Sequence, residues 1–136
     1  MPAYSRSPSL AAYQSVAAHG GVAAADPHRL IVMLMDGALE RIAAARCAIQ
    51  GGSREAKAQL LHRSVCILDE LRASLNFEAG GEIAQNLSAL YDYCSRQLMR
   101  ANLESRIELL DEVSTLIRDL RSAWIQLPAS ARAPGT

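Results

Sequence analysis

Hydrophobic residues recur along this chain with the three- and four-residue spacing of amphipathic helices. The pattern predicts four helices, at about 27–50, 53–76, 82–101 and 105–126. The connections between them are short, and no segment shows the alternation of a strand. Amphipathic helices of this length with short connections pack side by side, so we predict an all-α fold, an antiparallel four-helix bundle.

Capping and helix-breaking residues set the predicted boundaries. Asp26-Pro27 suits a helix start, because the carboxylate caps free amides and proline needs no N–H partner at the first position. Gly51-Gly52 ends this helix, and Ser53 caps the next one. Residues 79–81 are predicted to form the turn into the third helix, and Asn102 is predicted to break it.

Both ends of the chain differ in composition from the predicted bundle at 26–127. Residues 1–25 are small, polar and interrupted by proline and glycine, which predicts a mobile arm with a short helical cap near 9–16. Residues 128–136 begin with proline and are small and polar, so we predict a disordered tail there.

Composition and charge argue against several classes of partner. The chain has 14 basic and 14 acidic residues and no run of Lys or Arg, so we expect no binding to nucleic acid. No apolar run approaches the roughly 18 to 20 residues that span a bilayer, and no secretory signal pattern opens the chain. We therefore expect no membrane insertion.

No set of residues predicts catalysis, a metal or another cofactor. The histidines and cysteines are His19, His28, His62, Cys47, Cys66 and Cys94. They form neither Glu-x-x-His pairs nor Cys-x-x-Cys pairs, and no nucleophile elbow or phosphate loop is present. We expect a protein that is not an enzyme, with all three cysteines buried as small hydrophobes in a reducing cytosol.

The first helix is apolar on every side at Leu30–Met35. A helix of this kind is either buried on all sides or offers part of its surface to a partner. Some of Val32, Met33 and Met35 are the candidates for such a surface, and the two methionines suit it because methionine is flexible and polarisable. An element of the same chain could instead cover them, and Leu10 and Tyr13 form one apolar edge of the arm that could do so. The arm could cover this surface in the free protein and a partner could bind it in turn, if the partner displaces the arm.

The third helix carries a second candidate surface. Its apolar stripe consists of Ile83, Leu87, Leu90, Cys94 and Leu98. Tyrosine combines an apolar ring with a polar tip, which suits a surface that meets a partner, and Tyr91 and Tyr93 flank this stripe. Leu90 and Tyr91 are equally well read as core or as contacts. Asn86 and Tyr93 lie off the stripe and are the better candidates for exposure.

Several short motifs occur in the order and spacing of one known family. They are Tyr13–Val16, Asp26–Ile31, Met33–Ala38, Gly80–Leu87, Leu90–Tyr93, Leu98 with Ala101-Asn102, Glu112-Val113 and Ala123-Trp124. On these motifs the chain resembles the flagellin-specific export chaperones, the FliS family, over about residues 10–127. It departs from the family pattern at Leu10, Met35 and Cys94, where isoleucine, an aromatic residue and methionine are more usual.

The resemblance implies a cytosolic bacterial protein whose bundle binds the C-terminal segment of flagellin. Such chaperones prevent early polymerisation and assist delivery to the flagellar type III export apparatus, without ATP or metal. The flagellin tail is disordered when free and folds as it wraps around the bundle. The resemblance also implies that the arm occupies part of the groove and moves when flagellin docks.

The residues predicted to bind the partner are Leu10, Tyr13, Met33, Met35, Asn86, Leu90, Tyr91 and Tyr93. An apolar groove serves a second function equally well. The alternative is a regulatory or adaptor bundle that binds another flagellar protein, such as an anti-sigma factor or a component of the export gate.

Overall fold

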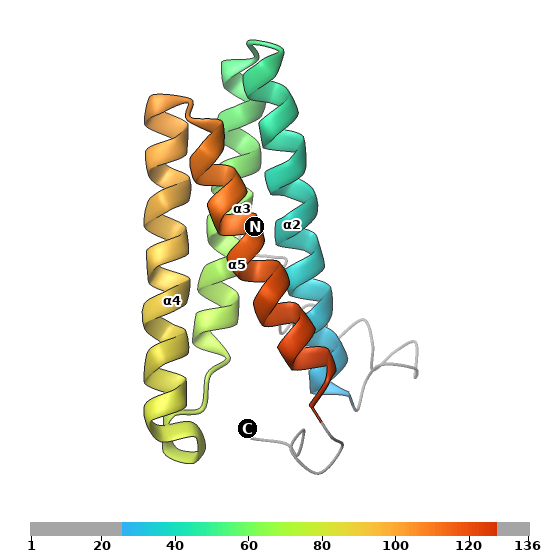
Figure 1. The fold of residues 1–136 in the computed structure, drawn as a ribbon, viewed down its shortest axis with the longest axis vertical. Coiled ribbons are helices and arrows are strands. Elements are labelled where there is room, and N and C mark those ends of the chain that lie inside the picture. The colour runs from blue at the N-terminus through green and yellow to red at the C-terminus, as the bar shows by residue number, and fades with distance from the viewer. Residues whose placement is uncertain (1–25, 128–136) are drawn as a thin grey trace, which may run out of the picture.

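The structure of the chain is a computed structural model that describes residues 26–127 (Figure 1). These residues form four helices: α2 (Pro27–Gln50), α3 (Arg54–Ala73), α4 (Phe77–Glu104) and α5 (Ile107–Ile125). Successive helices run in opposite directions and pack against each other, which confirms the predicted all-α bundle. The predicted arm, its helical cap and the C-terminal tail lie outside the described residues.

The ends of α2 and the start of α3 follow the prediction. The Asp26 side chain accepts a hydrogen bond from the backbone N–H of Arg29 at 3.2 Å, and Pro27 occupies the first helical position. After α2 ends at Gly51, the Ser53 hydroxyl accepts a hydrogen bond from the backbone N–H of Ala56 at 3.4 Å. These side chains partner amides that no helical carbonyl can reach.

The corner between α3 and α4 differs from the prediction. α3 ends at Ala73, and α4 begins at Phe77 rather than at 82. The reason is Asn76, whose side-chain oxygen accepts a hydrogen bond from the N–H of Ala79 at 3.0 Å and caps the helix there. The backbone does turn at Gly81, as predicted, and the long part of the helix follows from 82, but a first helical turn that the sequence did not predict precedes it.

The two glycines of this corner form the break between the first turn of α4 and the long helix that follows. Gly81 has φ 51° and ψ −125°, a conformation inside α4 that side chains rarely adopt. At Gly80 an added Cβ would lie 2.9 Å from the Cβ of Ala84, so this position has no room for a side chain. The kink thus needs both glycines, each for a different reason.

At its other end α4 continues through Asn102, so the predicted break there is also wrong. The helix ends at Ser105, whose φ of 52° is left-handed. Lys57 of α3, which is 8% exposed, donates from Nζ to the Asn102 carbonyl at 2.8 Å and to the Ser105 hydroxyl at 2.9 Å. A buried cation therefore partners the carbonyl end of α4, as the helix dipole favours.

The core lies between the four helices. Its buried members are Leu34, Met35, Ala38, Ile42, Ala45, Leu61, Ile67, Leu68, Leu71, Tyr91, Cys94, Leu98, Ala101, Leu109, Leu110, Val113 and Ile117. Cys94 is buried as predicted, but the same expectation for Cys47 and Cys66 is wrong. Cys47 is exposed near the end of α2, and Cys66 is only partly buried.

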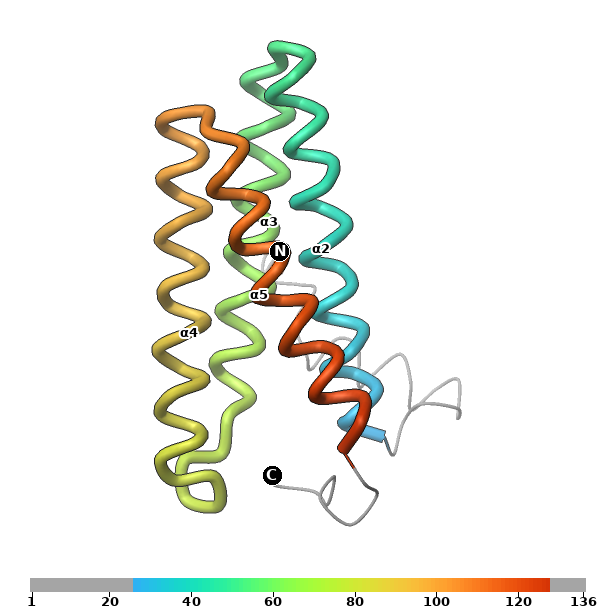
Figure 2. Tube along the Cα trace, viewed as in Figure 1, coloured from blue at the N-terminus to red at the C-terminus, as the bar shows by residue number. Residues whose placement is uncertain are grey.

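α5 does not run parallel to its neighbours. Figure 2 shows its first turns beside the end of α4, whereas its last turns lie beside the start of α2 and apart from the first turns of α4. The spacing between α4 and α5 therefore widens toward the corner at 73–83.

Replacing Lys57 with methionine tests the cap on α4. Lys57→Met leaves the Asn102 carbonyl without its donor in a buried place, so we expect a loss of about 1–3 kcal/mol of unfolding free energy. Urea denaturation measures this loss. Arg54→Met, at an exposed position on the first turn of the same helix, is the control and should change stability by less than about 0.5 kcal/mol. Equal stability of both variants would contradict the capping role.

Candidate protein-binding surface

The last turn of α5 is fastened to the first turn of α2 by a reciprocal pair of hydrogen bonds. The indole Nε1 of Trp124 donates to the backbone carbonyl of His28 at 3.0 Å. The imidazole Nε2 of His28 lies 2.6 Å from the carbonyl oxygen of Trp124. The two rings stack with centroids 5.2 Å apart and planes within 9°. We call this arrangement the His28–Trp124 clasp.

Two ion pairs continue this contact along α2. Arg121 donates from both Nε and Nη2 to the carboxylate of Asp36. Nearer the start of α5, Arg46 donates to Asp111 at 2.9 Å. Because these groups are partly exposed, each pair adds little free energy, but together with the clasp they tie α5 to α2 at points from Asp111 to Trp124.

α5 is joined to α4 near the start of α5. The hydroxyl of Tyr93 donates to one oxygen of the Glu112 carboxylate at 2.5 Å, and the amide of Gln97 donates to the other at 3.1 Å. The bond to Glu112 raises the pKa of Tyr93, and the bonds from Tyr93 and Gln97 lower the pKa of Glu112.

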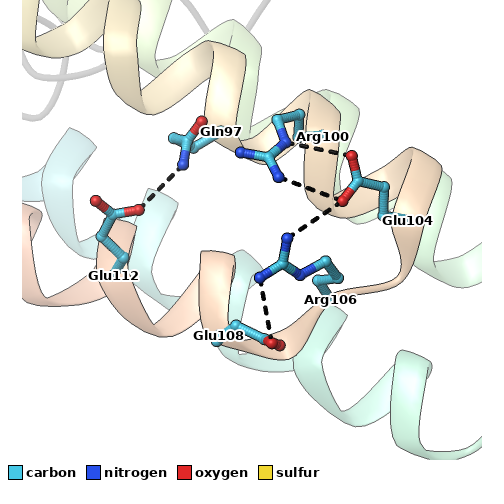
Figure 3. Close-up of polar contacts among 6 residues, drawn as sticks. All are labelled: Gln97, Arg100, Glu104, Arg106, Glu108 and Glu112. Carbon is cyan, nitrogen blue, oxygen red and sulfur yellow. Dashed lines mark hydrogen bonds and ion pairs between the residues drawn. The ribbon is translucent and has the colours of Figure 1, made fainter.

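Further polar contacts surround the loop between the two helices. Figure 3 shows Arg100 and Arg106 both directed at the carboxylate of Glu104, with Arg106 also reaching Glu108. The Arg106–Glu104 pair, at 3.5 Å, spans the connection from α4 to α5. This pair therefore links the end of α4 to the residue that precedes α5, whereas the Arg100–Glu104 pair lies within α4.

The face of α4 that meets α5 continues past the point where α5 turns away. Leu90 and Asn86 lie three and seven residues before Tyr93, so they share its face of the helix. On α5, Leu116 and Leu120 follow Glu112 at four-residue intervals and face the same gap. Their register therefore places these residues on the facing sides of α4 and α5, in the part of the bundle where Figure 1 shows the two helices diverging.

Apolar side chains in this space are incompletely covered. Ile83 is 70% exposed, although it shares the stripe of the buried Cys94. The leucines on either side are only partly buried against the core. We call the set the α4/α5 surface: Ile83, Asn86, Leu87, Leu90, Leu116 and Leu120. Apolar area that remains in contact with water offers free energy to any partner that covers it.

The predicted binding residues do not converge on one place. Asn86 is exposed and Leu90 partly buried, and both belong to the α4/α5 surface. Tyr93 lies at the end of this surface where its hydroxyl joins α4 to Glu112 of α5. Leu10 and Tyr13 fall outside the described residues.

Met35 and Tyr91 belong to the core, with exposed fractions of 0% and 5%. The expectation of an exposed Met35 is wrong, because its side chain points between the helices, whereas Met33, two residues earlier, points to the opposite side. Burial also raises the pKa of Tyr91.

Met33 is 38% exposed and lies on a different surface. It borders a shallow depression on α2 lined by Asp26, His28, Arg29, Val32, Met33 and Asp36. This depression lies beside the clasp rather than in the α4/α5 surface.

Helical periodicity in the sequence did not reveal that Ile83 is exposed, or that Leu116 belongs to the α4/α5 surface. Both follow from the direction of α5. A usable signal was the register of Leu116 and Leu120 with Glu112, which marks the face of α5 toward α4.

Within residues 26–127, no three His, Cys, Asp or Glu side chains gather closely enough to hold a metal ion. In the same range every buried side-chain nitrogen and oxygen has a hydrogen-bond partner. None of the described helices is long and apolar enough to cross a membrane.

Known proteins resemble this chain over most of its length. The family described as flagellar protein FliS matches residues 9–131. The chain belongs to this family. It is 40% identical over 120 residues to the flagellar secretion chaperone FliS of Vibrio cholerae, covering 88% of each protein.

Two further FliS relatives agree with this placement. The flagellar secretion chaperone FliS of Salmonella typhimurium is 41% identical over 123 residues, covering 90% of this chain and 91% of the relative. The Bacillus subtilis protein of the same name is 35% identical over 108 residues, covering 79% and 80%.

The contact between Tyr93 and Glu112 predicts a pH-dependent stability. Tyr93→Phe should lower the unfolding free energy at pH 7, since the Glu112 carboxylate loses a donor. The lowered pKa of Glu112 means that this contribution is complete above the ordinary value of 4.5 and is lost as the pH falls through the folded-state value. Urea denaturation at pH 7 and at pH 3.5 measures the difference from the wild type.

We expect that difference to shrink at the lower pH. A Tyr93→Phe variant that matches the wild type at pH 7, or that stays equally destabilised at both pH values, would contradict this role for the hydroxyl.

Proposed function

We propose that this FliS family member is a cytosolic chaperone for flagellin. It binds the disordered C-terminal segment of flagellin, prevents premature polymerisation and assists export by the flagellar type III secretion system. The names of the relatives support a role in flagellar secretion. The observation that carries the proposal is the uncovered apolar α4/α5 surface.

The composition of this surface suits an amphipathic segment. Ile83 and the four leucines offer an apolar strip between two helices, where a third helix or an extended stretch can place its own apolar side chains. Asn86 at the rim offers both an amide donor and a carbonyl acceptor to a peptide backbone. Binding of this kind needs no cofactor and no reaction.

A disordered client explains how binding can be both specific and reversible. The tail loses conformational freedom as it folds on the surface, and this cost reduces the affinity gained from apolar burial. The chaperone can therefore cover a long segment and still release it for export.

A second candidate function is that of an adaptor for another flagellar protein, such as an anti-sigma factor or an export-gate component. The depression beside Met33 favours it, since this partly exposed side chain on α2, bordered mostly by charged and polar residues, is separate from the α4/α5 surface. Competition experiments separate the two functions, because an adaptor partner at Met33 would bind together with the flagellin tail.

Calorimetry with a peptide spanning the C-terminal region of the cognate flagellin tests the proposal. We expect one-to-one binding with a negative heat-capacity change from coupled folding. Ile83→Ser removes the most exposed apolar side chain of the surface and should weaken binding about tenfold. Its thermal unfolding should stay close to that of the wild type, since little of this side chain is buried.

Leu103→Ser is the matched control. Leu103 is 84% exposed on the same helix but at its opposite end, so this variant should bind like the wild type. Absence of wild-type binding at high micromolar peptide would refute the chaperone function and favour the adaptor. If both variants weaken peptide binding equally, the client binds elsewhere on the bundle.

Deletion of residues 1–16 tests the role of the arm. We expect the affinity for the tail to change, because Leu10 and Tyr13 are predicted to reach the groove. A rise shows that the arm only competes with the tail, and a fall shows that it also contacts the tail. If calorimetry gives the same affinity with and without the arm, the arm neither competes with the tail nor contacts it.

A further inference from the structure

Cys66 and His62 lie one helical turn apart on α3 and are not part of the α4/α5 surface. The Sγ of Cys66 is 3.7 Å from the Nε2 of His62. His62 is exposed and Cys66 is partly exposed, so an ion from solvent can approach the pair. The proposed function uses neither residue.

The distance between these two atoms fits a shared metal ion. Zinc binds cysteine sulfur at about 2.3 Å and histidine nitrogen at about 2.0–2.1 Å, with tetrahedral angles. Two such ligands on one ion lie about 3.6 Å apart. The Sγ–Nε2 distance of the pair on α3 is therefore close to that of two ligands on one zinc ion. Without metal, the same approach amounts to a weak contact between a thiol and an imidazole.

We propose that Cys66 and His62 form a two-ligand site for a thiophilic divalent cation, with Zn²⁺ as the ion that fits it best. A soft thiolate together with an imidazole favours zinc over magnesium or calcium, which prefer oxygen ligands. Since no third His, Cys, Asp or Glu completes a metal cluster within residues 26–127, water fills the remaining positions.

The charges around the thiol bear on this site. Burial and the carboxylates of Asp69 and Glu70 raise the pKa of Cys66, and Arg63 acts in the opposite direction. The metal must therefore displace a proton from the thiol, while the nearby carboxylates favour a cation over an anion.

Cobalt titration of the full-length reduced protein tests the site. Co²⁺ substitutes for zinc, and its bond to a thiolate gives a charge-transfer absorption. We expect this absorption to saturate at one metal ion per chain and to disappear when Zn²⁺ is added. Cys66→Ser should abolish it, and His62→Ala should weaken Co²⁺ binding at least about tenfold.

Cys47→Ser is the matched control. Cys47 is an exposed cysteine on α2, and the residues three and four positions away are Ala43, Ala44, Gln50 and Gly51, none of which is a metal ligand of this kind. This variant should bind Co²⁺ like the wild type. Unchanged absorption in Cys66→Ser, loss of absorption in Cys47→Ser, or binding only at millimolar metal would overturn the proposal. If Cys66→Ser fails to fold, the exposed His62→Ala decides alone.

Discussion

The His28–Trp124 clasp is the contact on which the shape of this bundle depends. It joins residues 96 positions apart in the sequence and fixes the end of α5 to the start of α2. The ion pair of Arg121 with Asp36 supports the same placement. Since Glu112 holds the other half of α5 to α4, the helix cannot lie along both neighbours over its full length. The apolar stripe at the start of α4 is left partly uncovered as a result.

This incomplete packing connects the fold to the proposed function. A four-helix bundle normally buries its apolar stripes against its own helices. Here Ile83 and the leucines around it reach solvent, although they continue the stripe that forms the core further along α4. The free energy left in this surface is available to a client segment, and the partly buried leucines pack against the core beneath it. Client binding and the stability of the bundle thus use the same stripe of residues.

The sequence predicts those features that depend on neighbouring residues. Asp26-Pro27 and Ser53 cap helices beside clear apolar stripes, and the structure confirms both. The break at the glycine pair is present at Gly81, but the helical turn before it was missed, because Asn76 caps a new helix rather than ending the previous one. The burial of Met35 follows from its helical spacing to the buried Ala38 and Ile42, whereas the exposure of Ile83 depends on how α5 crosses the bundle. Contacts between distant residues set this direction, and helical periodicity carries no information about it.

The most direct test of the account is to map the client on the bundle by nuclear magnetic resonance. Backbone amides of the ¹⁵N-labelled full-length protein are followed while the flagellin C-terminal peptide is added. The account predicts that the largest shifts fall at residues 83–90 and 116–120, with little change at 99–104 on the far end of α4. Large shifts confined to the depression around Met33, or no shifts at saturating peptide, would contradict it.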